Sequence, residues 1–108
     1  MNPEIKAWLE SQFGEDPEIV GEVYGEYVVT SKAKLAELAA DFAARDWSKL
    51  DRTAHTIKGN ALMVGDKTVA DAAIALRAAA KAGADAEAAA LVGKIKELLA
   101  PVVGGGND

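Results

Sequence analysis

The sequence predicts an all-α protein, an antiparallel up-down four-helix bundle with a short additional helix at the N-terminus. Of the 108 residues, 50% are hydrophobic and only 6% are aromatic, and alanine, the strongest helix former, dominates the second half. Apolar residues recur every three or four positions, whereas the period-two alternation that is typical of strands is nearly missing. Only a few residues join the predicted helices, so successive long helices should pack antiparallel.

The first two predicted helices each begin with a capping residue followed by proline. Proline suits the first turn of a helix because the N–H group that it lacks has no intrahelical partner there. The first helix is expected over residues 3–13, with Asn2 as its N-cap and Gly14 after its last turn. The second is expected over residues 17–44, with Asp16 as its N-cap.

The last two predicted helices are rich in alanine and are bounded by aspartate, glycine and proline. One covers residues 67–81 and is capped by Asp66. The other is expected to be capped by Asp85 and to end before Pro101, because proline disrupts the interior of a helix.

Composition and charge narrow the classes of function. The chain has 12 basic and 17 acidic residues and a formal net charge of −5, which argues against a general nucleic-acid-binding protein. With no cysteine and one histidine, disulfides and thiolate or multi-histidine metal sites are not expected. The N-terminus has no long apolar run, so we expect neither a signal peptide nor a membrane span. We expect a soluble, cytoplasmic protein, a monomer in the simplest case, with one domain over residues 1–103 and a flexible tail over residues 104–108.

A third helix, between the second and the alanine-rich pair, carries the single histidine. It is expected to start after Asp46 or Ser48 and to run to about Val64, before Gly65. On a wheel that advances about 100° per residue, its apolar residues form one stripe. This core stripe consists of Leu50, Ala54, Ile57, Ala61 and Val64. His55 lies about 140° from Leu50 on the wheel, so its side chain is predicted to face solvent.

A glycine follows the histidine by one helical turn. Gly59 costs the helix about 0.8–1 kcal/mol relative to alanine, which the sequence uses almost everywhere else. One interpretation is an ordinary exposed histidine beside a tolerated glycine. The other is that the missing side chain opens access to His55 for a bulky group or a partner surface. Leu62, which is apolar but lies off the core stripe, is typical of a docking surface and favours the second interpretation.

The residue types around His55 suit a nucleophile, and they would suit a phosphoryl group if His55 accepts one. A neutral imidazole is a nucleophile near neutral pH, and an accepted phosphoryl group would need a nearby cation. Lys58, three residues after His55, lies on a neighbouring face and can reach it. Asp51, four residues before it, could accept a hydrogen bond from Nδ1 and leave Nε2 free to attack; an acidic residue there also simply keeps the helix soluble.

The stretch "AHTIKGNALMVG", residues 54–65, resembles the H-x-x-K-G signature of histidine-containing phosphotransfer (HPt) domains. A long helix that starts at "DPEI" and two alanine-rich helices after the motif extend the resemblance over most of the chain. The resemblance implies that His55 accepts and donates phosphate at Nε2, that Lys58 stabilises it, and that Gly59 keeps the site open. The implied partners are response-regulator receiver domains, which hold their own magnesium ion, and a hybrid histidine kinase.

Two positions depart from the family pattern. Asn60 stands where a small residue such as serine, glycine or alanine is frequent, which could alter hydrogen bonding near the site. Arg77 stands in "ALRAA" where "LE" is common, and we expect this change to affect only the surface. Leu62 and Met63, with the N-terminal helix, are expected to offer a partner apolar contact around His55.

No Gly-rich phosphate loop or ATP-binding kinase module is evident, so the chain is expected to relay phosphate as a carrier, without an ATP site, metal or cofactor of its own. Two alternatives stay open. The chain could be the phosphoacceptor domain of a larger chemotaxis-type histidine kinase. It could also be a helical module that binds response regulators without transfer, although a pure binder would need none of the set His55, Lys58 and Gly59.

Overall fold

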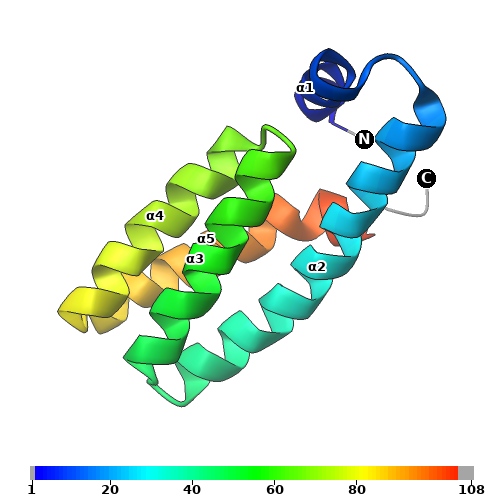
Figure 1. Cartoon of the computed structure of the whole chain (residues 1–108). Coiled ribbons are helices and arrows are strands. Elements are labelled where there is room, and N and C mark those ends of the chain that lie inside the picture. The colour runs from blue at the N-terminus through cyan, green and yellow to red at the C-terminus, as the bar shows by residue number, and fades with distance from the viewer. Residues whose placement is uncertain (1, 105–108) are drawn as a thin grey trace.

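The computed structural model describes residues 2–104, and this part of the chain is helical with no strands (Figure 1). Its helices are α1 (Pro3–Phe13), α2 (Pro17–Ala43), α3 (Trp47–Met63), α4 (Lys67–Ala82) and α5 (Asp85–Gly104). The all-α prediction is confirmed, and the predicted ends of the first four helices agree with the structure to within one residue. Of the predicted tail, Gly104 is the last residue of α5, and residues 105–108 lie outside the described residues.

The first four helices begin at the side chains that the sequence predicts as N-caps. In each case a side-chain oxygen accepts a hydrogen bond from a backbone N–H group two or three residues later, which would otherwise be unpaired. The pairs are Asn2 with Glu4, Asp16 with Glu18, Asp46 with Lys49, and Asp66 with Val69. Asp46 and not Ser48 is therefore the cap of α3.

The fifth helix differs from its prediction at both ends. Asp85 is the first residue of the helix and not its cap, and its carboxylate is bound by Arg45. The helix also continues through Pro101 instead of ending before it. The proline removes one backbone hydrogen bond of the helix, but the next residue, Val102, is only 5% exposed in the core. Continuing the helix buries that side chain.

The four longer helices contact one another in a closed ring. α3 packs against α2 and α4, and α5 packs against α4 and α2, so the core lies between all four (Figure 1). The largest fully buried side chains are Leu9, Leu38, Leu50, Val64, Val69, Leu76, Ile95 and Leu99. α1 packs against α2 near the connection between α3 and α4. This arrangement leaves one long face of α3 free of helices.

A glycine in the connection between α3 and α4 allows the N-terminal helix to pack closely against this connection. Gly65 has φ +71°, a conformation that side chains other than glycine rarely adopt, and a Cβ there would overlap the indole of Trp8. The neighbouring side chains Ile5 and Leu9 are buried. The position of α1 beside the end of α3 therefore depends on the absence of a side chain at Gly65.

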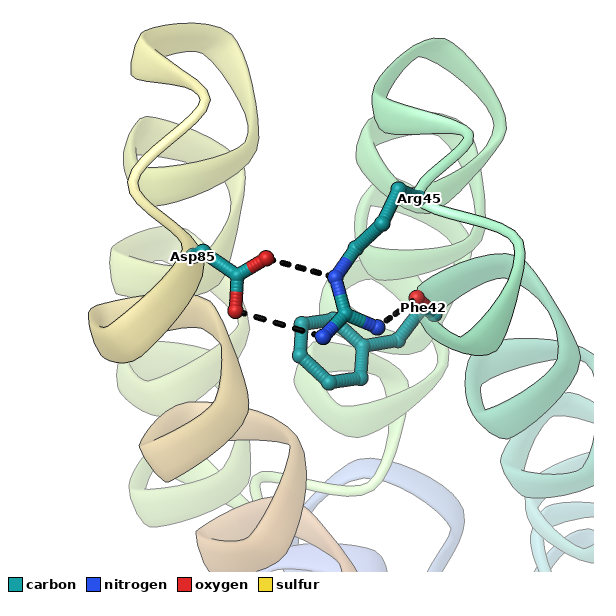
Figure 2. A network of polar contacts seen from close by, with 3 residues as sticks. All are labelled: Phe42, Arg45 and Asp85. Atoms are coloured by element: carbon teal, nitrogen blue, oxygen red, sulfur yellow. Dashed lines mark hydrogen bonds and ion pairs between the residues drawn. The ribbon is translucent and has the colours of Figure 1, made fainter.

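The opposite end of the bundle is tied by an arginine (Figure 2). Arg45, in the connection between α2 and α3, donates hydrogen bonds to both carboxylate oxygens of Asp85, at the start of α5. It also donates to the backbone carbonyl of Phe42 at 2.8 Å and stacks over the phenyl ring at 4.1 Å. A planar guanidinium can make all of these contacts at once, which a lysine could not.

None of the helices within residues 2–104 is long and apolar enough to span a membrane.

Candidate functional site

The outward face of α3 lies where the wheel predicts it. The core stripe from Leu50 to Val64 is at most 3% exposed at every position, whereas His55 is exposed. One buried residue of α3 was missed: the hydroxyl of Thr53 donates a 2.6 Å hydrogen bond to Asp41 of α2. The burial of Thr53 fixes the rotation of α3 against α2, and this rotation turns His55 to solvent.

His55, Lys58 and Gly59 share the free face of α3. His55 and Gly59 are exposed, and Lys58 is half-buried on the side toward α4. A Cβ added at Gly59 would meet no atom within 4 Å outside the helix's own backbone. Gly59 also has an ordinary helical conformation, unlike the positive-φ Gly65. Neither packing nor backbone geometry therefore requires a glycine at position 59, and the free space lies one turn from the imidazole.

Asp51 makes a contact that the sequence did not predict. Its Oδ1 accepts a hydrogen bond from Nε of Arg77 at 2.8 Å, across the interface between α3 and α4. The prediction for Arg77 is wrong, because its side chain is only 27% exposed and it crosses to the helix that carries His55. The predicted hydrogen bond between Asp51 and Nδ1 of His55 is not among the contacts of the described residues; Arg77 takes the carboxylate oxygen instead.

Asn60 does not join the residues around His55. Five residues separate the two, which places their side chains about 140° apart around the helix. Asn60 is half-buried and lines a shallow pocket toward α2, together with Tyr27, Thr30 and Met63. The departure from the family pattern at this position therefore lies on the α2 flank of α3, away from Lys58.

Apolar side chains are exposed near the C-terminal end of α3. Leu62 is 49% exposed and Met63 is 66% exposed, as the docking prediction requires. On α1, Trp8 and Phe13 are 41% and 45% exposed. Sequence reasoning missed Ile74 on α4, which is 51% exposed and lies one turn from Arg77. A large aliphatic residue in a helix whose other apolar residues are mostly alanine was the available signal.

A partly buried hydrogen bond lies just beyond the C-terminal end of α3. The hydroxyl of Tyr27 on α2 donates to Oδ2 of Asp66, the N-cap of α4, at 2.7 Å. Burial of the ring, followed by this hydrogen bond, raises the pKa of Tyr27 well above its ordinary value. The bond joins α2 to the connection that follows Leu62 and Met63.

Comparison with protein families gives one match. The family model described as "Hpt domain" matches residues 22–103, which include all of α3 and α4 and most of α2 and α5. Comparisons with curated proteins and with solved structures found no significant match. The matched segment covers most of the chain and contains the exposed histidine, its lysine and its glycine, and the chain belongs to the Hpt domain family.

Proposed function

We propose that this protein relays a phosphoryl group to and from the aspartates of receiver domains in a two-component phosphorelay, with His55 as the phosphoacceptor. The single observation that carries the proposal is the open space at Gly59, one turn from the exposed imidazole. A glycine that the fold does not require costs helix stability, and access to His55 accounts for that cost. Membership of the Hpt domain family gives independent support.

The proposed transfer is a reversible exchange between an imidazole and an acyl phosphate. The lone pair of Nε2 of His55 forms the N–P bond as the P–O bond to the receiver's aspartate breaks, and the aspartate leaves as a carboxylate. Lys58 lies three residues along the helix and stabilises the charge on the phosphoryl oxygens. A magnesium ion held by the receiver would supply charge neutralisation on the aspartyl side of the exchange, and the chain is proposed to contribute no metal or other cofactor.

The chain acts in this proposal as a carrier and not as an enzyme. It takes the phosphoryl group from one receiver, for example that of a hybrid histidine kinase, and passes it to another, in the cytoplasm and as a monomer. The four longer helices are proposed to run alternately up and down, which the ring of contacts and the short connections support. Leu62 and Met63 with α1 are proposed as the apolar part of the docking surface.

A panel of receiver domains tests the proposal. Each domain is phosphorylated with radiolabelled acetyl phosphate, freed of the donor and mixed with the protein or with His55→Gln. We expect label on the wild-type chain from at least one receiver and none on His55→Gln, with circular dichroism showing that the variant folds. Label on His55→Gln, or no transfer from any receiver of a broad panel, contradicts the proposal.

A further inference from the structure

We propose that Arg77 cancels the negative charge of Asp51 and thereby favours the phosphorylated state of His55. The inference rests on the proposed function and adds a positioning residue to it, one that acts on the phosphoryl group through Asp51. The sequence pattern gives no sign of this role, because Arg77 lies on a different helix from His55, 22 residues further along the chain.

The ion pair lies next to the phosphoacceptor. Asp51 precedes His55 by four residues on α3, so the two side chains project from the same face, one turn apart. Nε of Arg77 reaches Oδ1 of Asp51 at 2.8 Å from α4. The two side chains are 27% and 23% exposed, so solvent screens this pair less than it screens a pair on the open surface.

The charges around His55 explain why the pair matters. Arg52 and Lys58 stand three residues before and after His55, so two cations flank the imidazole on either side of the helix face. The negative charge of an unpaired Asp51 would weaken the positive field of these two cations at His55. A phosphoryl group brings up to two further negative charges, and a free carboxylate one turn away would repel it. With Arg77 bound, Asp51 belongs to a pair with no net charge, and the field of the two cations remains.

A merely structural tie between helices predicts a different result. The pair formed by Arg45 and Asp85 also joins an arginine to a carboxylate across elements, at the other end of α3 from Leu62 and Met63 (Figure 2). Both pairs are expected to contribute modestly to stability. Only the pair of Arg77 and Asp51 lies within one turn of His55, so only this pair is expected to affect the phosphorylated state. The Arg45 pair is therefore a matched control.

The equilibrium constant of phosphoryl transfer distinguishes a residue that compensates charge near His55 from a residue that only helps the receiver to dock. A residue that acts through docking alone changes the forward and reverse rates together and leaves the ratio of phosphohistidine to phosphoaspartate unchanged. A residue that stabilises the phosphohistidine changes that ratio. The measurement uses the full chain and one receiver domain from the panel that exchanges with it, and the partition of label between the two proteins gives the equilibrium constant.

The wild type, the two single variants and the double variant form a double-mutant cycle that changes the net charge of the pair of Arg77 and Asp51. Arg77→Gln leaves one uncompensated negative charge and is expected to lower the equilibrium constant about threefold to tenfold, as expected for charges one helical turn apart near a protein surface. Asp51→Asn leaves one uncompensated positive charge and is expected to raise it. The double variant, again without net charge, is expected to return to within about twofold of wild type, and added salt should shrink the single-variant effects.

Each outcome either supports or overturns the inference. An equilibrium constant for Arg77→Gln equal to wild type overturns it, as does a double variant that stays at the Arg77→Gln value. Arg45→Gln and Asp85→Asn are expected to leave the equilibrium constant unchanged. A decrease in the constant for Arg45→Gln as large as that for Arg77→Gln would show a general effect of charge and would overturn the inference. If Arg77→Gln does not fold, the test rests on Asp51→Asn and the double variant. A wild-type chain that accepts no label contradicts the proposed function instead.

Discussion

His55 and Gly59 lie one turn apart on the free face of α3, and a Cβ at Gly59 would meet no atom within 4 Å outside the helix's own backbone. The glycine thus leaves a gap beside the imidazole that the fold itself does not use. In the proposed phosphotransfer, an incoming receiver domain has to bring its aspartyl phosphate to the imidazole from solvent. A side chain at position 59 would project into that path. Stability and transfer should therefore respond in opposite directions when the gap is filled.

Filling the gap is the first test. Gly59→Ala is expected to raise the free energy of unfolding by about 0.8–1 kcal/mol, because alanine is the better helix former and the space is free. Gly59→Leu is expected to slow transfer by about tenfold or more, because the reacting groups can no longer align. Urea unfolding and transfer kinetics measure the two effects.

The matched control for stability is Gly65→Ala. Gly65 has φ +71° and lies against Trp8, so a methyl group there strains the backbone and displaces the indole. The free energy of unfolding should fall for Gly65→Ala and rise for Gly59→Ala. Transfer at the wild-type rate by Gly59→Leu would remove the explanation of the glycine at position 59.

Lys58 provides the second test. Lys58→Ala is expected to slow phosphoryl transfer by about tenfold and to shorten the lifetime of the phosphohistidine, because a cation near the phosphoryl oxygens is lost. Acceptance should persist, since the nucleophile is unchanged. Lys81→Ala, which removes an exposed lysine in the last turn of α4, serves as control and should behave as wild type. Equal behaviour of the two variants would exclude a special role for Lys58.

The hydrogen bond between Tyr27 and Asp66 gives a prediction about pH. Burial and this bond raise the pKa of Tyr27 above its ordinary value of 10.0, so the folded state keeps the phenol proton to higher pH than the unfolded chain. The folded state then binds more protons, and stability should fall as the pH rises above about 10. Tyr27→Phe is expected to cost about 1 kcal/mol at pH 7 and to reduce that alkaline loss.

Urea unfolding of wild type and Tyr27→Phe at pH 7 and at pH values above 10 checks this prediction. Tyr24→Phe is the control. Burial also raises the pKa of Tyr24, but its hydroxyl makes no hydrogen bond among the contacts of the described residues. Its removal should therefore cost less at pH 7. Parallel loss of stability in wild type and Tyr27→Phe above pH 10 would contradict the prediction.

Local sequence signals predicted most of the fold and the exposed positions of His55 and Gly59. The caps at Asn2, Asp16 and Asp66 and the apolar period of α3 depend on residues a few positions apart, so they can be found without a structure. The same period predicted that His55 faces solvent. The open space at Gly59 agrees with the prediction that a residue without a side chain leaves access to the imidazole.

Features that depend on contacts between helices could not be predicted from the sequence. The continuation of α5 through Pro101 depends on the burial of Val102, and the bond between Arg77 and Asp51 depends on the rotation of α4 against α3. The hydrogen bond from Thr53 to Asp41 has the same origin. Each needs the register of two helices, which a pattern within one helix does not contain.

The central claim is that His55 carries the phosphoryl group. Mass spectrometry of the intact protein, followed by fragmentation, tests it directly after mixing with a phosphorylated receiver domain. We predict one added phosphoryl group, located on His55, lost in acid and retained in alkali, and missing from His55→Gln. A phosphoryl group on any other residue, or an acid-stable one, would contradict the account.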